Sequence, residues 1–179
     1  MCIIIFYFLY IFTWYFILGR ILSDQCEYSI KIASYNNKNN SVFKSHKEFT
    51  GSILSSLDES YAYLLLNNNN KSTFKGIERI DKLDYPNEVL REALINAIVH
   101  RSYSFSGSII ININPFQIEF ISTGGLISGL TKEDIMQGIS EQRNKKLAEL
   151  FLRLNYIESY GTGIKKYLNH MKSILKSQK

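Results

Sequence analysis

Residues 87–101 read NEVLREALINAIVHR and predict a helix that is apolar on nearly every side. Pro86 stands immediately before this stretch. Proline suits the first turn of a helix, because its fixed φ is helical and its missing N–H is not needed there. A helix that is apolar all round is normally buried between other parts of a domain. The stretch therefore predicts a central, buried helix from Pro86 to about Arg101.

Three polar side chains recur along this helix at intervals of four residues: Glu92, Asn96 and His100. At about 100° per residue they share one arc of roughly 80°. Burying a carboxylate or an amide without a partner is costly, so these groups need hydrogen bonds. One interpretation is an internal network with a neighbouring sheet. The other is a stripe that faces a ligand, where the carboxylate activates water and the amide oxygen ligates a hard cation such as Mg²⁺.

The remaining patterns predict a mixture of strands and helices around the buried helix. In chain order we expect a strand over Ser29–Ala33, a helix within Phe49–Leu66, a β-hairpin of Ser108–Asn114 and Gln117–Ile121, a short helix opened by a capping box of Thr131 and Asp134, a helix over about Asn144–Leu154, and a last helix after Gly163. This order indicates an α+β sandwich, with helices on one face of a mixed or antiparallel sheet.

Two glycine turns stand at positions where backbone N–H groups could hold an anion. Gly124-Gly125 follows a predicted strand, and Gly161-Thr162-Gly163 directly precedes a predicted helix. Each turn alone is more often structural. The sequence contains no GxxxxGK[ST] motif, which excludes a Walker-type phosphate loop.

The composition fits one ordinary domain with an appendage. The chain has 179 residues, of which 45% are hydrophobic and 21% are charged, and this excludes a wholly disordered protein. Two cysteines, Cys2 and Cys26, cannot build a disulfide scaffold. The three histidines are scattered, so we do not expect a structural metal.

Positive charge is concentrated in the C-terminal tail. Residues 143–179 hold nine basic and two acidic residues, whereas residues 1–70 hold five of each. Such a tail favours phosphate-bearing partners such as DNA. A solvated helix face is the alternative interpretation.

The first eighteen residues carry no charge and are almost entirely apolar. They just reach the length that spans a bilayer, and Arg20 follows them. They lack the basic start and the small-residue cleavage site of a secretory signal. A membrane anchor, a remnant or start-site artefact, and a packed core segment all remain open. We expect a cytoplasmic protein, with a single N-terminal membrane anchor as the alternative.

Residues 84–104, DYPNEVLREALINAIVHRSYS, resemble the YPxxALREALxNAxxHRDYS segment of the RecG-like ATP-binding C-terminal domain. That domain occurs in proteins called ATP-dependent DNA helicases or transcriptional regulators. Further segments follow in the family's order: Ile118–Leu126, Gly129–Thr131, Arg143-Asn144 and Gly161–Ile164. Lys47-Glu48-Phe49 with Gly51 resembles the family's connecting region more loosely. We therefore expect a hydrophobic segment over 1–20, a connecting region over 21–77, and the ATP-binding domain with its basic helical tail over 78–179.

The family is similar to the GHKL ATPase fold of DNA gyrase, MutL and histidine kinases. The resemblance implies a two-layer α/β sandwich, with Glu92 as the catalytic, water-activating carboxylate and Asn96 as the Mg²⁺ ligand. It implies that Gly124 and Gly125 lie near the adenine and that Gly161 to Gly163 lie by the phosphates. The implied nucleotide-binding residues are Asn96, His100, Arg101, Ser122, Gly124, Gly125, Gly161, Thr162 and Gly163.

The sequence departs from the family at the glycine turn and in length. Ser122-Thr123 stands where the wider fold has the acidic residue that reads the adenine amino group, and Thr123 also replaces the family's usual proline. The chain is too short to include the Schlafen/AlbA-like N-terminal domain of many relatives. It has no helicase motor motifs, so we do not expect strand separation.

Taken together, these features predict a truncated, GHKL-like ATP-binding module of a DNA-associated transcriptional regulator. The expected cofactors are ATP and Mg²⁺, with slow Mg²⁺-dependent hydrolysis as the candidate activity. The expected partners are the nucleotide, DNA through the basic tail or a missing N-terminal domain, and a second copy in a homodimer. Two rivals remain: a nucleic-acid-binding or dimerisation module that has lost nucleotide binding, and a nonfunctional gene remnant.

Overall fold

The computed structural model describes residues 28–157 apart from 138 and 140. The elements in chain order are β1 (Ile30–Tyr35), β2 (Phe43–Phe49), α2 (Ile53–Leu66), β3 (Asn70–Lys75), β4 (Glu78–Leu83), α3 (Asn87–Val99), β5 (Ile109–Ile113), β6 (Ile118–Ile121), α4 (Lys132–Gln137) and α5 (Lys145–Arg153). The predicted last helix, the glycine turn before it and the N-terminal apolar segment lie outside the described residues.

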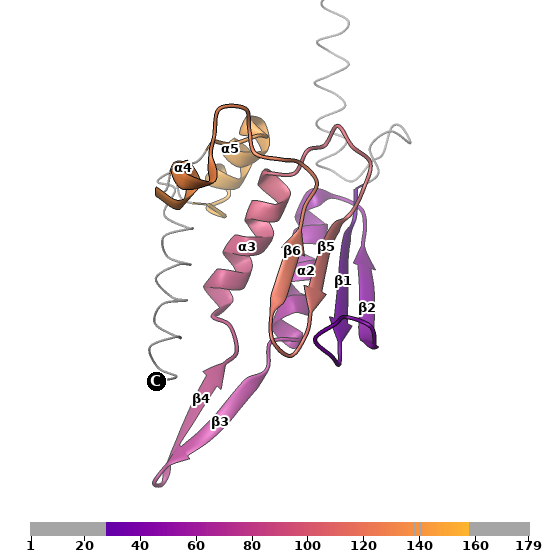
Figure 1. The fold of residues 1–179 in the computed structure, drawn as a ribbon. Coiled ribbons are helices and arrows are strands. Elements are labelled where there is room, and N and C mark those ends of the chain that lie inside the picture. Colours follow the sequence, from indigo (N-terminus) through magenta and orange to yellow (C-terminus); the bar gives the residue numbers. More distant parts are fainter. Residues whose placement is uncertain (1–27, 138, 140, 158–179) are drawn as a thin grey trace, which may run out of the picture.

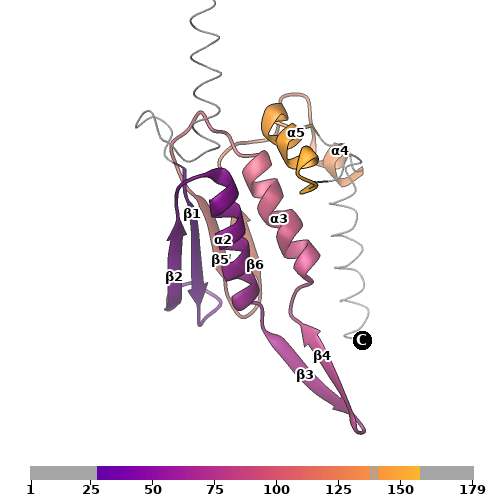
Figure 2. The ribbon, with the colours of Figure 1, turned by 180° about the vertical axis from the view of Figure 1, so that it is seen from behind.

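Four strands form one mixed sheet in the order β2-β1-β5-β6. The central strands β1 and β5 run parallel, whereas each pairs with its outer neighbour in an antiparallel hairpin. Helices α2 and α3 lie side by side over one face of this sheet, as the two opposite views show (Figures 1 and 2). The predicted two-layer α/β sandwich with a mixed sheet is thus confirmed.

The core lies between these two layers because each element turns one apolar side toward it. Successive strand residues point to opposite faces, so Ile30 and Ile32 of β1 and Ile109 and Ile111 of β5 are buried on the helix side. Leu94 and Ile98 of α3 have no exposed surface. The buried helix predicted from the NEVLREALINAIVHR stretch therefore forms the centre of the fold.

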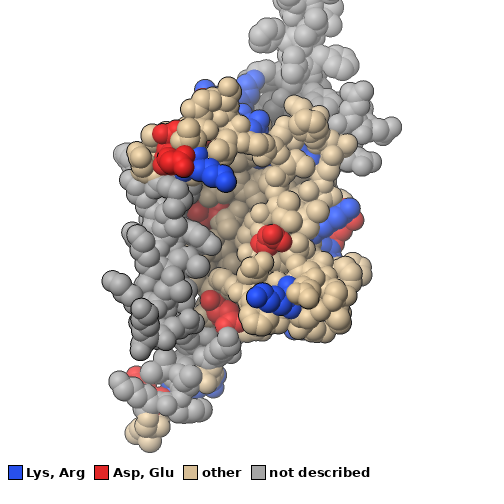
Figure 3. Space-filling model, viewed as in Figure 1, with Lys and Arg blue, Asp and Glu red and all other residues tan. Residues whose placement is uncertain are grey.

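The other face of the sheet carries charges of both signs. In Figure 3, basic and acidic side chains are interspersed over the described part of this face. Lys31 of β1 forms an ion pair with Glu48 of β2, with 3.5 Å between Nζ and Oε1.

Residues 30–66, which the sequence assigned to a connecting region, supply two strands and a helix to the sandwich.

The helix α3 begins and ends close to its predicted bounds, and the β5–β6 hairpin matches its prediction. The capping box before α4 is also confirmed. The Thr131 N–H donates to Asp134 Oδ2 at 2.9 Å, and the Asp134 N–H donates to Thr131 Oγ1 at 3.2 Å. No helix within the described ranges is long and apolar enough to cross a membrane.

Strand β2 and the β3–β4 hairpin were not predicted. Only Phe49 of β2 is buried, so this edge strand shows no alternation of polar and apolar residues in the sequence. The β3–β4 hairpin extends away from the sandwich (Figure 1) and turns through Gly76, whose φ is +66°. Its two ends are joined by Asn68, whose side chain bonds the carbonyl and the N–H of Tyr85 at 2.7 and 3.1 Å.

We expect Leu94→Ala to lower the free energy of unfolding by about 2–5 kcal/mol, because the truncation leaves a cavity at a fully buried position of α3. The matched control is Leu66→Ala, since Leu66 ends α2 with 84% of its surface exposed and should change stability by less than about 0.5 kcal/mol. Urea unfolding followed by circular dichroism measures both. Equal effects would contradict the central position of α3.

Candidate functional site

Two of the three polar residues of α3 contact each other. The Asn96 Nδ2 donates a hydrogen bond to Glu92 Oε1 at 3.3 Å, one helical turn away. Both side chains are half-buried. Within the described part of the chain, neither has another side-chain hydrogen bond or ion pair. The carboxylate and the amide are therefore held side by side, with oxygen atoms left for a ligand.

His100 caps the C-terminal end of the same helix, where its N–H bonds the Asn96 carbonyl at 3.0 Å. Its imidazole is half-buried. Burial lowers the pKa of His100 below its ordinary value of 6.5, and the positive charge of Arg143 lowers it further. The ring is therefore neutral at pH 7, and each nitrogen has a distinct role as donor or acceptor.

The carbonyls at the end of α3 are bonded by side chains from three different segments. Tyr103 Oη donates to the Ile98 carbonyl at 3.0 Å, and Ser122 Oγ donates to the Ala97 carbonyl at 2.8 Å. Asn144 Nδ2 donates to the carbonyls of Val99 and Arg101, both at 2.7 Å. These bonds bring the segment after α3, the segment after β6 and the start of α5 to one place.

The predicted glycine turn lies at this end of α3. The Ser102 N–H donates to the Thr123 carbonyl at 2.7 Å, which fixes the turn against the segment that leaves the helix. Gly124 has a φ of +122°, and a Cβ there would lie 3.2 Å from Ser102 Cβ and 3.3 Å from Ser102 N. Position 124 therefore requires glycine for both conformation and space.

Arg143 and Asn144 also contact the glycine turn and the end of α3, although we predicted no role for either. Arg143 Nη2 donates to the Gly125 carbonyl at 2.6 Å, so the guanidinium holds the turn from its other side. Asn144 directly precedes α5, where a side chain ordinarily caps its own helix, but it makes no such bond. Its amide bonds α3 instead. Only the occurrence of Arg143-Asn144 in the family's order marked this pair.

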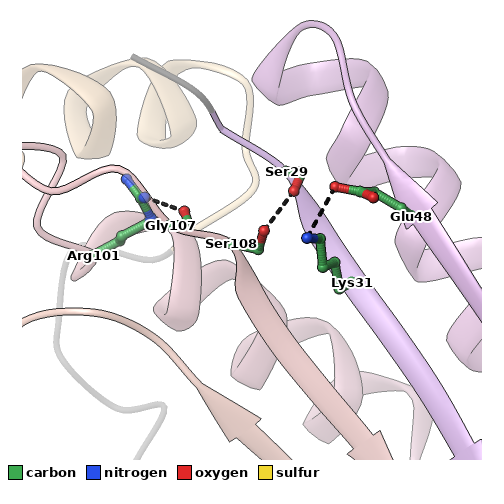
Figure 4. Close-up of polar contacts among 6 residues, drawn as sticks. All are labelled: Ser29, Lys31, Glu48, Arg101, Gly107 and Ser108. Carbon is green, nitrogen blue, oxygen red and sulfur yellow. Dashed lines mark hydrogen bonds and ion pairs between the residues drawn. The ribbon is translucent and has the colours of Figure 1, made fainter. Parts of the chain in front are cut away.

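Arg101 has a structural role in the loop that follows α3. The residue is 1% exposed, and its guanidinium lies 4.7 Å from the Tyr103 ring centroid. The guanidinium donates to the Phe105 carbonyl at 3.0 Å and also to the Gly107 carbonyl, a bond drawn in Figure 4. Nearby, the hydroxyls of Ser29 and Ser108 are 2.7 Å apart, joining the approaches to β1 and β5 (Figure 4). A contact between Arg101 and a nucleotide stays a prediction.

The structure thus gathers part of the predicted site. His100, Ser122, Gly124 and Gly125 meet at the C-terminal end of α3, and the Glu92–Asn96 pair lies along the helix before them. Gly161, Thr162 and Gly163 lie outside the described residues. Residues 28–157, where described, hold no cluster of three or more His, Cys, Asp or Glu side chains suited to a metal. Mg²⁺ takes few protein ligands when phosphates supply the rest, so an amide beside a carboxylate fits this ion.

We expect Gly124→Ala to destabilise the protein by about 1–3 kcal/mol, because alanine is strained at this positive φ and its Cβ presses on Ser102. Gly125→Ala is the matched control, since nothing lies within 4 Å of a Cβ there. It should change the unfolding free energy by less than about 0.5 kcal/mol. Thermal and urea unfolding of both variants would test this, and a tolerated Gly124→Ala would refute the close approach.

The lowered pKa of His100 predicts a loss of stability in mild acid. The unfolded chain binds a proton near pH 6.5, whereas the folded protein binds it only at lower pH. The contribution of neutral His100 is therefore complete above about pH 6.5 and is lost as the pH falls toward the folded pKa. His100→Gln should flatten this part of the stability profile, measured by urea unfolding at a series of pH values. A slope that His100→Gln leaves unchanged would contradict the burial of the neutral imidazole.

Comparison with known proteins agrees with this description of the fold. The crystal structure of the DIP2311 protein from Corynebacterium diphtheriae matches with a TM-score of 0.70 and 22% identity, covering 78% of this chain and 29% of that one. At this identity the likeness shows a shared fold, over less than a third of the other protein's length. No curated protein matches.

One protein family matches the C-terminal part of the chain. Its model carries the description "Putative ATP-dependent DNA helicase recG C-terminal" and matches residues 107–178. This range contains the glycine turn, Arg143 and Asn144, whereas α3 precedes it. The family suggests an ATP-binding module. The resemblance of this chain to the RecG-like C-terminal domain, indicated by its sequence motifs, is thereby confirmed.

Proposed function

We propose that this protein binds ATP together with Mg²⁺ along α3, with the base at the Gly124–Gly125 turn and the phosphates toward Asn96 and Glu92. The observation that carries the proposal is the Asn96–Glu92 hydrogen bond of 3.3 Å, which pairs an amide and a carboxylate on a half-buried helix face. A purely structural pair would be expected to bond the sheet, but these two side chains bond only each other within the described residues. The family match to an ATP-binding module supports the same proposal.

The hydrogen bond also assigns the chemical role of each side chain. Because the amide nitrogen of Asn96 donates to Glu92, the amide oxygen is left to ligate a cation. Glu92 keeps its second carboxylate oxygen to accept a proton from an attacking water. Mg²⁺, when bound, would neutralise phosphate charge and orient the phosphates. We propose slow ATP hydrolysis with Glu92 as the general base.

We further propose that the module serves a DNA-associated transcriptional regulator, with DNA and a second copy of the chain as partners. The positive charge of residues 143–179 supports a partner that carries phosphates. Within the described part of the tail, Arg153 pairs with Glu149 at 2.6 Å and Lys145 pairs with Glu141 at 3.9 Å. These cations are already paired, so the nucleotide proposal is the better supported of the two.

Isothermal titration of the full chain with ATP, with and without Mg²⁺, tests the proposed binding. A measurement of phosphate release tests the proposed hydrolysis. Asn96→Ala should abolish the Mg²⁺-dependent part of binding because it removes the ligating amide. Glu92→Gln should keep ATP binding and lower the rate of phosphate release by about a hundredfold or more.

The chain offers a matched control on the open face of the sheet. There Asn112 Nδ2 donates to Glu119 Oε2 at 3.2 Å, so the same chemical pair occurs away from α3. Asn112→Ala should alter neither binding nor phosphate release. ATP binding that does not depend on Mg²⁺ and is unchanged in Asn96→Ala would overturn the proposed site.

A further inference from the structure

Two carbonyls at the Gly124–Gly125 turn accept hydrogen bonds from within the protein. The Thr123 carbonyl accepts the Ser102 N–H at 2.7 Å, and the Gly125 carbonyl accepts Arg143 at 2.6 Å. The Ser122 hydroxyl uses its proton on the Ala97 carbonyl at 2.8 Å. These bonds hold the turn against the segment that ends α3 and against Arg143.

Arg143 supplies charged hydrogen-bond donors at the turn. A guanidinium carries several N–H donors in a planar fork and no acceptor. The structure uses Arg143 for one hydrogen bond, to Gly125, and gives it no ion pair among the described residues. Its Nε lies 3.5 Å from the place where a Cβ of Gly124 would stand, so the fork is directly beside the turn.

The described carboxylates near this region are committed elsewhere. Glu119 accepts from Asn112 on the open face of the sheet, and Glu141 pairs with Lys145. Glu92 accepts from Asn96, two turns of α3 before His100. No described acidic side chain bonds the turn, so the charged group that a ligand would meet there is the Arg143 guanidinium.

We infer that Arg143 is a specificity-determining residue that selects the nucleobase through its acceptor atoms. This inference rests on the proposed nucleotide binding. The N7 atom of every purine accepts a hydrogen bond, whereas the 6-position is a donor in adenine and an acceptor oxygen in guanine and hypoxanthine. A guanidinium can bond O6 and N7 together but only N7 of adenine. The site therefore binds 6-oxopurine nucleotides more tightly than ATP.

The decisive comparison is between ATP and inosine triphosphate, which carries an oxygen in place of the 6-amino group. Isothermal titration of the full chain in the presence of Mg²⁺ should show that inosine triphosphate binds about five- to a hundredfold more tightly than ATP. GTP should also bind more tightly than ATP. Arg143→Gln should remove most of this preference by weakening the 6-oxopurine nucleotides. Lys145→Gln is the matched control in the same segment and should preserve the preference.

Arg143→Lys is the second variant, because lysine keeps the charge at the turn without the planar fork. Circular dichroism would establish that the Arg143→Lys variant is folded. Its preference for inosine triphosphate over ATP should fall toward that of Arg143→Gln. Tighter binding of ATP than of inosine triphosphate, or a preference that survives both substitutions, would overturn this inference while leaving nucleotide binding intact. Absence of binding by all three nucleotides would overturn the proposed function as well.

Discussion

The end of a buried helix leaves carbonyl groups that the helix itself cannot bond, and each must find a donor. In this protein the requirement is met at α3 by Tyr103, Ser122 and Asn144, side chains from three separate segments. The bonds span up to 45 residues of sequence. The loop after α3, the turn after β6 and the start of α5 therefore converge because one set of carbonyls needs partners.

This convergence explains why the candidate site lies where it does. The polar residues of α3 point the same way because they recur at helical spacing, but that spacing does not say what they face. The capping bonds bring the glycine turn and Arg143 to the helix end that His100 occupies. Burial of α3 against the sheet thus creates the need for capping, and capping assembles the site. The apolar face of α3 buries the helix against the sheet, and the caps that this burial requires bring the glycine turn to the polar residues of the same helix.

The sequence was informative where a pattern is local. The buried helix, the β5–β6 hairpin and the Thr131–Asp134 capping box all follow from spacing or from residues a few positions apart. Strand β2 was not predicted, because a nearly fully exposed edge strand shows no alternation of polar and apolar residues. The need for glycine at position 124 depends on Ser102, and the role of Asn144 depends on carbonyls of α3. Such long-range contacts leave no periodic signal in one sequence.

The link between α2 and α3 has a consequence for how the chain tolerates change. The β3–β4 hairpin leaves and re-enters the sandwich at adjacent points, where Asn68 bonds Tyr85. The chain therefore leaves α2 and enters α3 at points that are held together by these two hydrogen bonds. Insertion of foreign segments succeeds mainly at exposed loop tips, and Ile77 at the tip is wholly exposed. The tip is thus a natural attachment point for a fluorophore or a fused domain that leaves the α3 site undisturbed.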